Sequence, residues 1–236
     1  ERGDRDAVEA ALGGRWQRTR RAEVGRGPAC RRCLLSEMPS DREFEALAAE
    51  VRRCRICEDV LPLGPHPVFQ LHPAARILVA SQAPGRKVHD TGVPFNDASG
   101  ERLRRWLGLG REAFYNPRLV AIVPIGLCYP GRGRSGDLPP RPECAPRWRA
   151  SMLATLVRLE LTLAIGQYAL DWHLGTQRGN LTQIVRRWQE FWPAVVPLPH
   201  PSPRNNGWLA QNPWFERELV PQLQQRVAQI LRRSRA

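Results

Sequence analysis

Six cysteines are the residues of this sequence whose type and spacing point most directly to chemistry. Four of them form two Cys-x-x-Cys pairs, and the other two stand apart later in the chain. In the cytosolic protein that we expect, such pairs favour metal binding over disulfides. Zinc held by the two pairs, as in a zinc ribbon, would leave the two later cysteines without a role. The cysteines are Cys30 and Cys33, Cys54 and Cys57, Cys128, and Cys144.

A loop rich in Gly and Pro begins at residue 81. Residues 81–85 read Ser-Gln-Ala-Pro-Gly, and residues 92–100 bring further Gly and Pro ahead of a helical pattern. Gly and Pro at this density let the backbone approach a ligand closely. Ser99 is a candidate cap for the helix that follows.

A second loop, residues 199–208, carries the most reactive side chains of the C-terminal part. Three prolines stiffen it, and it presents His200, Ser202 and Arg204. A rigid loop with these side chains suits contact with a phosphate backbone.

The apolar pattern predicts a sheet that brings the two loops together. Four short runs are nearly continuous in apolar residues rather than alternating, as expected of parallel strands buried on both faces. Helical patterns alternate with them, which predicts a doubly wound α/β fold. In such folds ligands bind beyond the carboxyl ends of the strands, where both loops begin. The expected strands are residues 76–80, 119–124, 161–165 and 194–198, and the expected helices are residues 101–107, 148–159, 167–174, 181–191 and 215–233.

The chain is strongly basic. Its formal net charge is +13, its isoelectric point is about 10.9, and Lys87 is its only lysine. A preference for arginine over lysine does not explain the excess of positive charge, so we expect DNA or another phosphate-rich partner. No apolar run reaches the roughly 20 residues of a membrane span. We therefore expect a cytoplasmic monomer that acts on DNA and has no membrane partner.

The folded domain is expected to begin at Met38. Residues 1–37 are dominated by Arg, Glu, Asp and Gly with little apolar periodicity, which predicts a basic, disordered extension. Ser40 and Glu43 have the spacing of a capping box, and Phe44 begins an apolar helical face. Residues 38–236 are then long enough for one domain.

The two loops resemble the active-site motifs of uracil-DNA glycosylases. The resemblance rests on residues 81–85, 92–95 and 200–202, and it spans about residues 45–230. With the cysteines, it is closest to the iron–sulfur branches called families four and five. It implies a three-layer αβα sandwich with a four-stranded, mostly parallel sheet. It also implies an enzyme that flips a damaged or deaminated base, uracil or a related base, out of DNA and hydrolyses its N-glycosidic bond.

The resemblance also implies a role for each motif residue. Phe95 would stack on the flipped base, and His200 would stabilise the negative charge on the leaving base as a neutral donor. The enzyme is expected to be monofunctional and to use water, because Lys87 is the only lysine that could form a Schiff base. Further substrate contacts would come from Gln82, Ala83, Pro84 and Gly85, and DNA contacts from Ser202, Arg204 and Asn205.

A cofactor follows from the same resemblance. In family four, a Cys-x-x-Cys pair and two later cysteines hold a 4Fe–4S cluster, and thiolates are the usual ligands of such clusters. Zinc is the alternative metal. The matching residues are Cys54, Cys57, Cys128 and Cys144.

The first motif departs from the family pattern. Gln82 stands where family four has a glutamate, and Ala83 stands where the classical enzymes have an aspartate. Gln82 can position a water, but neither side chain can take its proton. His89, Asp90 and Asp97 are the nearby substitutes.

A second departure is Pro124, at the end of the second expected strand. The related families often use an asparagine there to read the edge of uracil, whereas proline offers neither a side-chain amide nor a backbone N–H. A different deaminated or modified base is therefore an open alternative. Two other functions stay open: a binder of damaged DNA on the same fold without efficient chemistry, and a zinc-ribbon module that binds nucleic acid.

Overall fold

The computed structural model describes residues 40–134, 136–175 and 179–233. The expected basic extension over residues 1–37, with Cys30 and Cys33, lies outside these residues, and the domain boundary near Met38 stays a prediction.

The first described helix is α3, Asp41–Arg52. Ser40 and Glu43 form the expected capping box, since Ser40 Oγ accepts from the Glu43 N–H at 3.3 Å and the Glu43 carboxylate accepts from the Ser40 N–H at 2.9 Å.

The central sheet has four parallel strands in the order β2-β1-β5-β6. The strands are buried along their length, with Val195 half-buried, which explains their continuous apolar sequences. The expected sheet is confirmed, although β2 is shorter than expected because Pro124 has no N–H to donate to a neighbouring strand. The bounds are β1 Ile77–Ala80, β2 Val120–Ile122, β5 Leu161–Ile165 and β6 Val195–Leu198.

Helices alternate with these strands along the chain. In the described ranges, no helix is both long and apolar enough to cross a lipid bilayer. Three of the short α-helices, over residues 86–91, 111–115 and 206–211, were not expected, because five or six residues are too few to show a helical period. The α-helices after α3 are α4 Arg86–Thr91, α5 Ala98–Leu107, α6 Arg111–Tyr115, α7 Ala150–Ala154, α8 Gln167–Leu174, α9 Leu181–Arg186, α10 Asn206–Gln211 and α11 Val220–Arg232.

Two helical segments differ from the expected bounds. The helix expected over residues 148–159 begins as a π-helix, Ala145–Arg149, and α7 ends at Ala154. It ends early because the Thr155 hydroxyl donates to the Met152 carbonyl at 2.7 Å and competes with the helical pattern. The helix expected over residues 181–191 is divided into α9 and a 3-10 helix, Trp188–Phe191.

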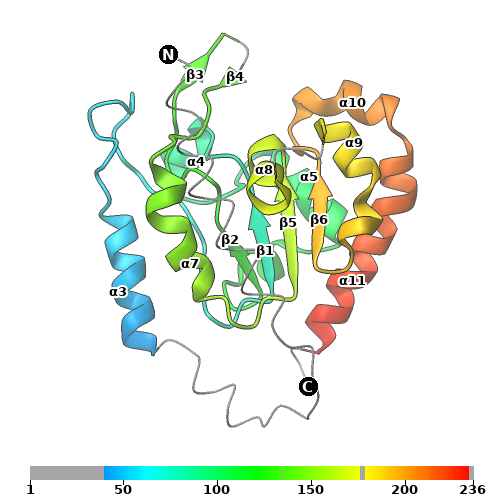
Figure 1. Cartoon of the computed structure of the whole chain (residues 1–236), viewed down its shortest axis with the longest axis horizontal. Helices are drawn as coiled ribbons and strands as arrows, with labels where there is room; N and C mark the ends of the chain where they lie inside the picture. The colour runs from blue at the N-terminus through cyan, green and yellow to red at the C-terminus, as the bar shows by residue number, and fades with distance from the viewer. Residues whose placement is uncertain (1–39, 135, 176–178, 234–236) are drawn as a thin grey trace. The chain divides into compact units, whose positions relative to one another are not determined.

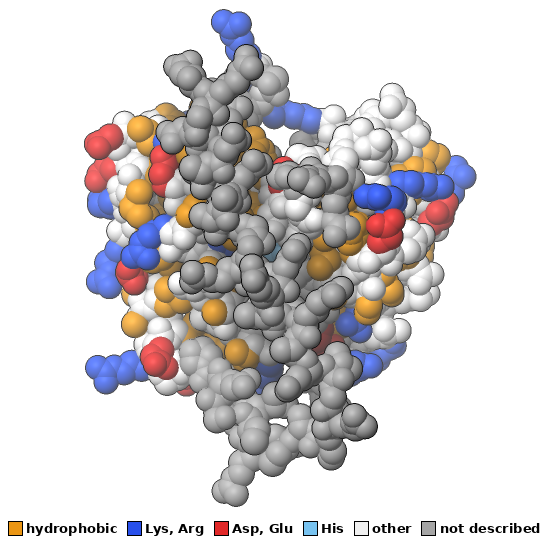
Figure 2. All heavy atoms as spheres, in the orientation of Figure 1, with side chains coloured by type: hydrophobic (Ala, Val, Ile, Leu, Met, Phe, Trp, Pro, Cys, Tyr) orange, Lys and Arg blue, Asp and Glu red, His pale blue; other side chains and the backbone are white. Residues whose placement is uncertain are grey.

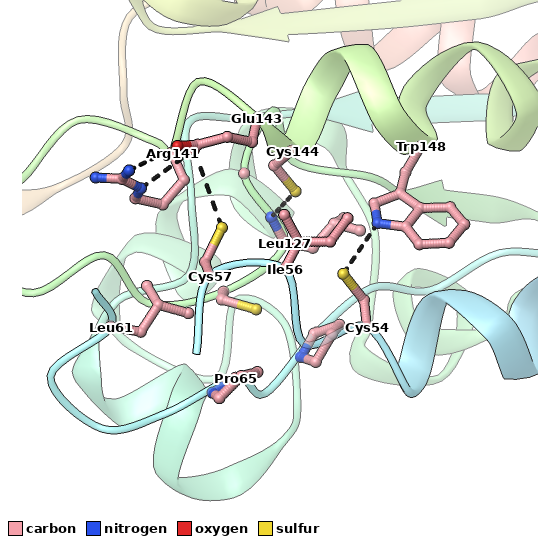
Figure 3. A pocket seen from close by; sticks show the side chains of 13 residues that line it. Cys54, Ile56, Cys57, Leu61, Pro65, Leu127, Arg141, Glu143, Cys144 and Trp148 are labelled. Atoms are coloured by element: carbon pink, nitrogen blue, oxygen red, sulfur yellow. Dashed lines mark hydrogen bonds and ion pairs between the residues drawn. The ribbon is translucent and has the colours of Figure 1, made fainter. Parts of the chain in front are cut away.

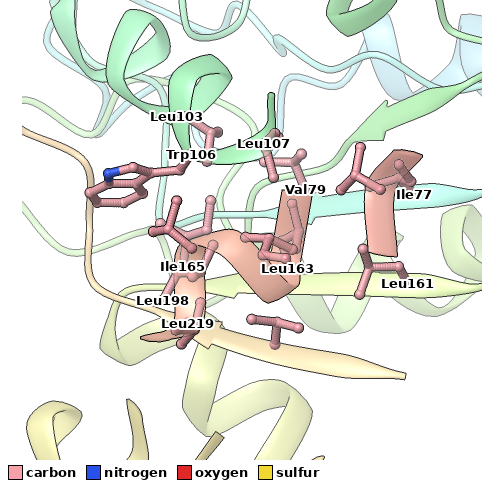
Figure 4. Packing of buried hydrophobic residues seen from close by; sticks show 14 of the residues in the cluster. Ile77, Val79, Leu103, Trp106, Leu107, Leu161, Leu163, Ile165, Leu198 and Leu219 are labelled. Carbon is pink, nitrogen blue, oxygen red and sulfur yellow. The ribbon is translucent and has the colours of Figure 1, made fainter. Parts of the chain in front are cut away.

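Helices cover both faces of the sheet and complete three layers (Figure 1). Alternate residues of β1 point to opposite faces. Ile77 and Val79 pack in one buried cluster with residues of α5 and α11, part of which Figure 4 shows. Leu78 and Ala80 pack in the other cluster with residues of α3, α7 and α8. The three-layer αβα sandwich is therefore confirmed.

A short antiparallel hairpin was not expected. Its strands are β3, Arg132–Gly133, and β4, Gly136–Asp137, with Arg132 opposite Asp137. Two-residue strands have no apolar alternation to reveal them. Figure 1 shows the hairpin beyond the carboxyl ends of the central strands, with α10 on the other side of that end.

Candidate active site

A cleft lies at the carboxyl ends of the central strands, where both motif loops were expected. Its walls come from the loop after β1, the start of α5, strand β4 and the loop after β6. The fold therefore brings together motifs that are more than a hundred residues apart. Of the expected site residues, the cleft is lined by Gln82, Ala83, Pro84, Gly85, Phe95, Asp97, His200, Ser202, Arg204 and Asn205.

His200 follows β6 and has a defined hydrogen-bonding state. Its Nδ1 accepts from the Ser202 N–H at 3.2 Å, and its carbonyl oxygen accepts from Asn205 Nδ2 at 2.7 Å. Burial lowers the pKa of His200, more than the nearby carboxylates of Asp97 and Asp137 raise it. A neutral imidazole whose Nδ1 is an acceptor carries its proton on Nε2. The ring can therefore offer an Nε2–H donor.

The loop that follows His200 is held by its own hydrogen bonds and by α5. Ser202 Oγ accepts from the Arg204 N–H at 3.3 Å, which begins a short 3-10 turn. From α5, Arg102 Nη1 donates to the Ser202 carbonyl at 3.0 Å and Arg102 Nη2 donates to Asn206 Oδ1 at 2.7 Å. The exposed Arg204 side chain has no hydrogen bond or ion pair to a described residue, so it is available for a ligand.

Phe95 is fixed from several sides. It is buried and has a φ of 54°, an uncommon backbone conformation for a non-glycine residue and one often found at functional sites. Tyr115 donates its hydroxyl to the Phe95 carbonyl at 3.1 Å. Gly100 lies against the same peptide, where any Cβ would overlap the Phe95 backbone. The Phe95 ring therefore has a defined place in the cleft wall.

The loop after β1 is held against the loop after β2. The Ile125 N–H donates to the Ser81 carbonyl at 2.8 Å, and the Gly126 N–H donates to the Gln82 carbonyl at 2.9 Å. The Gln82 side chain points to the hairpin segment, where its Nε2 donates to the Leu138 carbonyl at 3.5 Å. Its amide therefore contributes to placing the hairpin.

Asp97 lines the cleft and also caps α5. Its Oδ1 accepts from the Gly100 N–H at 2.9 Å. The expectation that Ser99 caps this helix was wrong, because α5 begins at Ala98 and Ser99 is already inside its first turn. Asp97 thus has one carboxylate oxygen committed to the fold.

The other two candidates for activating water, His89 and Asp90, are not among the residues that line the cleft. Both lie on α4. Asp90 accepts from the Arg86 guanidinium at 2.9 Å on the surface. The His89 carbonyl accepts from His66 Nδ1 at 2.7 Å, and the two rings meet edge to face. The structure does not bring either residue to the cleft.

Asp137 lines the cleft and was missed as a catalytic candidate. It lies on β4, and its Oδ2 is 3.6 Å from the position that a Cβ on Gly85 would occupy. Its charge also acts on His200. The sequence carries only a weak signal for it, a single carboxylate in a Gly-rich and Arg-rich loop.

The sequence from residue 68 to residue 224 matches the family described as Uracil DNA glycosylase superfamily. The match covers about two thirds of the chain and includes both motif loops. The chain belongs to this superfamily. Its members are in general DNA glycosylases, so DNA is the partner of the family. The matched segment begins after Cys54 and Cys57, and the iron–sulfur branch stays a prediction.

The charges of this glycosylase-family cleft are mixed. Arg86, Lys87 and Arg204 line it together with Asp97 and Asp137. Figure 2 shows Lys and Arg side chains projecting from both edges of the visible face. Cations placed in this way attract phosphates of a nucleic acid.

A second pocket contains the cysteines (Figure 3). Residues from three distant segments line it, including all four of the expected cluster ligands. Within the described ranges, no group of three Cys, His, Asp or Glu side chains is arranged to hold a metal ion. We call this the cysteine pocket, and its thiols belong to Cys54, Cys57, Cys128 and Cys144.

The four cysteines of the cysteine pocket are half-buried, and two of their thiols accept from N–H donors. Burial raises the pKa of Cys128 to about 12 and that of Cys144 to about 11. The Leu127 N–H donates to Cys144 Sγ at 3.3 Å, and Trp148 Nε1 donates to Cys54 Sγ at 3.2 Å. Donors of this kind stabilise metal-bound thiolates and tune the clusters they hold.

A buried arginine lies between the cysteine pocket and the cleft. Arg149 is 2% exposed, and its Nη1 donates to the carbonyls of Val123 and Pro124 at 3.0 and 3.2 Å. Its Nη2 lies 2.8 Å from Nε2 of His173, whose pKa falls to about 3, mainly through burial. No carboxylate in the described ranges pairs with Arg149. Burial raises the pKa of Cys144, and the charge of Arg149 opposes part of that rise.

Proposed function

We propose that the protein is a DNA glycosylase that flips a deaminated base, uracil or a related base, out of DNA and hydrolyses its N-glycosidic bond. The observation that carries the proposal is a neutral His200 in the same cleft as Phe95. The flipped base stacks on Phe95. As the bond to C1′ breaks, its electron pair moves to the base, and the Nε2–H of His200 donates to the base oxygen that becomes negative.

The hydrogen bond from the Ser202 N–H makes His200 suitable for this role. It fixes the ring before the substrate arrives, so the donor needs no reorientation during the reaction. Burial favours the neutral ring, and the bond that Nδ1 accepts leaves the proton on Nε2. One donor of this type contributes about 2.7–4 kcal/mol to stabilising a transition state.

The same loop is proposed to contact the DNA backbone. Arg204 supplies an exposed cation, while Ser202 and Asn205 set the shape of the loop through their hydrogen bonds. Arg102 ties the loop to α5. Backbone contacts of this kind fix the register of the enzyme on DNA without reading its sequence.

The nucleophile is proposed to be water. Lys87 lines the cleft and is the only lysine in the chain, so it is the single side-chain amine that a bifunctional mechanism could use. A Schiff base would therefore depend on this one exposed side chain of α4. We therefore propose a monofunctional enzyme that leaves an intact abasic site.

Pro124 affects which flipped bases the cleft can accept. It lines the cleft at the end of β2, and its carbonyl already accepts from Arg149. This position therefore cannot read the edge of uracil with the two hydrogen bonds of an amide. We propose that the cleft accepts deaminated bases other than uracil as well.

The cysteine pocket is proposed to hold a 4Fe–4S cluster bound by Cys54, Cys57, Cys128 and Cys144. Three features support the fit: four thiols line one pocket, N–H groups donate to two of them, and the buried charge of Arg149 offsets thiolate charge. When bound, the cluster supplies structural cross-links rather than redox chemistry. Cys128 and Cys144 then hold the two ends of the segment that carries the β3–β4 hairpin.

A panel of oligonucleotides tests the proposed function. Each carries one uracil, hypoxanthine or xanthine, in single-stranded and duplex form, with an unmodified strand as the control. We expect an alkali-labile site at the modified base of at least one member and none in the control. Retarded mobility without alkali-labile sites on every member would favour the damaged-DNA binder instead.

A further inference from the structure

Asp137 is the most available carboxylate in the cleft. It is exposed, and its side chain makes no hydrogen bond or ion pair with a described residue. Its Oδ2 lies above the loop after β1, 3.6 Å from the place that a Cβ on Gly85 would take. Asp137 and His200 both line the cleft, and the charge of Asp137 acts on the ring. This arrangement places a free carboxylate opposite the proposed donor to the leaving base.

Gln82 contacts the segment that carries Asp137. Its Nε2 donates to the Leu138 carbonyl, directly after Asp137. A glutamate at residue 82 could not make this bond, because an ionised carboxylate has no proton to donate. Gln82 stands where related enzymes have a carboxylate. Its amide therefore supports the segment that carries a different carboxylate, Asp137.

The hairpin also contacts the loop after β6. Gly136 has a φ of 148°, and a Cβ there would collide with the guanidinium of Arg204. A residue with a side chain would strain the backbone and displace Arg204. Gly136 therefore lets Asp137 approach the loop that carries His200.

The other carboxylates near the motifs are less available. Asp97 commits Oδ1 to the cap of α5, and Asp90 is paired with Arg86 outside the cleft. Asp137 has both oxygens free of described partners.

We infer that Asp137 is the catalytic carboxylate that positions and deprotonates the attacking water, an inference that rests on the proposed glycosylase function. The water oxygen forms the new bond to C1′ while the C1′–N bond breaks. The electron pair of that bond leaves with the base, whose oxygen accepts from His200 Nε2–H. The proton of the water passes to the Asp137 carboxylate and is later available to the released base anion.

The test compares Asp137→Asn with Glu112→Gln, which removes one exposed carboxylate from α6, outside the cleft. Single-turnover rates are measured on the panel duplex that the wild type cleaves fastest. We expect Asp137→Asn to be about 100-fold slower or more, the range of general base catalysis. Its DNA affinity should be unchanged or higher, because a negative charge beside the phosphates is removed. Glu112→Gln should match the wild type in rate.

A stability measurement and a second variant distinguish loss of catalysis from loss of folding. Because the Asp137 side chain makes no hydrogen bond or ion pair with a described residue, the thermal midpoint of Asp137→Asn should match that of the wild type. Adding Gln82→Glu to Asp137→Asn restores a carboxylate at the family position and should recover part of the lost rate.

Two results would overturn the inference. An Asp137→Asn rate equal to the wild type, on DNA that His200→Ala cleaves slowly, would reject Asp137 and leave the glycosylase function intact. A wild type that releases no base from any panel member would reject the proposed function, and the role of Asp137 with it.

Discussion

Variants of His200 can distinguish the effects of two hydrogen bonds that this one side chain makes. His200→Ala removes the Nε2–H donor and also the Nδ1 acceptor of the Ser202 N–H. Losing the donor should slow base release about 10²- to 10³-fold, or by about 2.7–4 kcal/mol. Losing the acceptor leaves a partly buried N–H without its partner, which costs about 1 kcal/mol of folding stability.

Two amide variants distinguish these effects. In His200→Gln the side-chain nitrogen can reach the place of Nε2, so a donor to the base remains. In His200→Asn the shorter amide reaches only the place of Nδ1, where its oxygen can still accept from the Ser202 N–H. We expect His200→Gln to keep more of the wild-type rate than His200→Asn. The asparagine variant should be as slow as alanine but more stable to heat.

Single-turnover rates at saturating enzyme isolate the chemical step from DNA binding. DNA affinity should change little in all three variants, because the donor acts mainly in the transition state. The lowered pKa of His200 sets the pH dependence: the neutral ring is present above that pKa and is lost only as the pH falls through it. The ring should therefore contribute no step near 6.5, the ordinary value for histidine. A wild-type rate for His200→Ala, or equal rates for the two amide variants, would refute this reasoning.

Three further predictions concern the metal, the nucleophile and the fold. The protein should be brown with the visible absorbance of an iron–sulfur cluster, and Cys54→Ser should lose the colour and melt earlier; a colourless wild type with stoichiometric zinc would favour the zinc alternative. Borohydride should trap no covalent adduct with DNA during excision, whereas an adduct that disappears in Lys87→Met would show a Schiff base. The free energy of unfolding should fall as the pH drops from about 6.5 to about 3, by up to about 1.4 kcal/mol per unit, because folded His173 stays neutral where the unfolded chain binds a proton. An equal slope in His173→Asn would contradict that assignment.

The sheet could be predicted because each of its strands is a nearly continuous apolar run. The buried segments around Ile77 and Leu161 have no competing polar pattern. Helix ends were less predictable, since Thr155 ends α7 through its own hydroxyl and the apolar period continues past it. The cap of α5 was assigned to Ser99, although Asp97 lies at the true start. Both residues are good caps, and only the backbone conformation decides between them.

The two sides of the site were predictable to different degrees. Phe95 and His200 lie in motifs that follow strands, so both the resemblance and the topology predicted them. Asp137 reaches the cleft through tertiary contacts, in which Gln82 supports the hairpin and Gly136 makes room for Arg204. No local pattern encodes such contacts. The sequence also could not show that Asp97 lines the cleft while His89 and Asp90 do not, because this depends on the orientation of α4.

Release of the free base is the most direct test of the central claim. Mass spectrometry of a single reaction can measure both the free base and the abasic strand, with enzyme in excess over a modified duplex. The proposed reaction predicts equal amounts of the two products from the wild type, and a parallel fall of both in His200→Ala. Complete binding of every modified duplex with no free base released would contradict base excision.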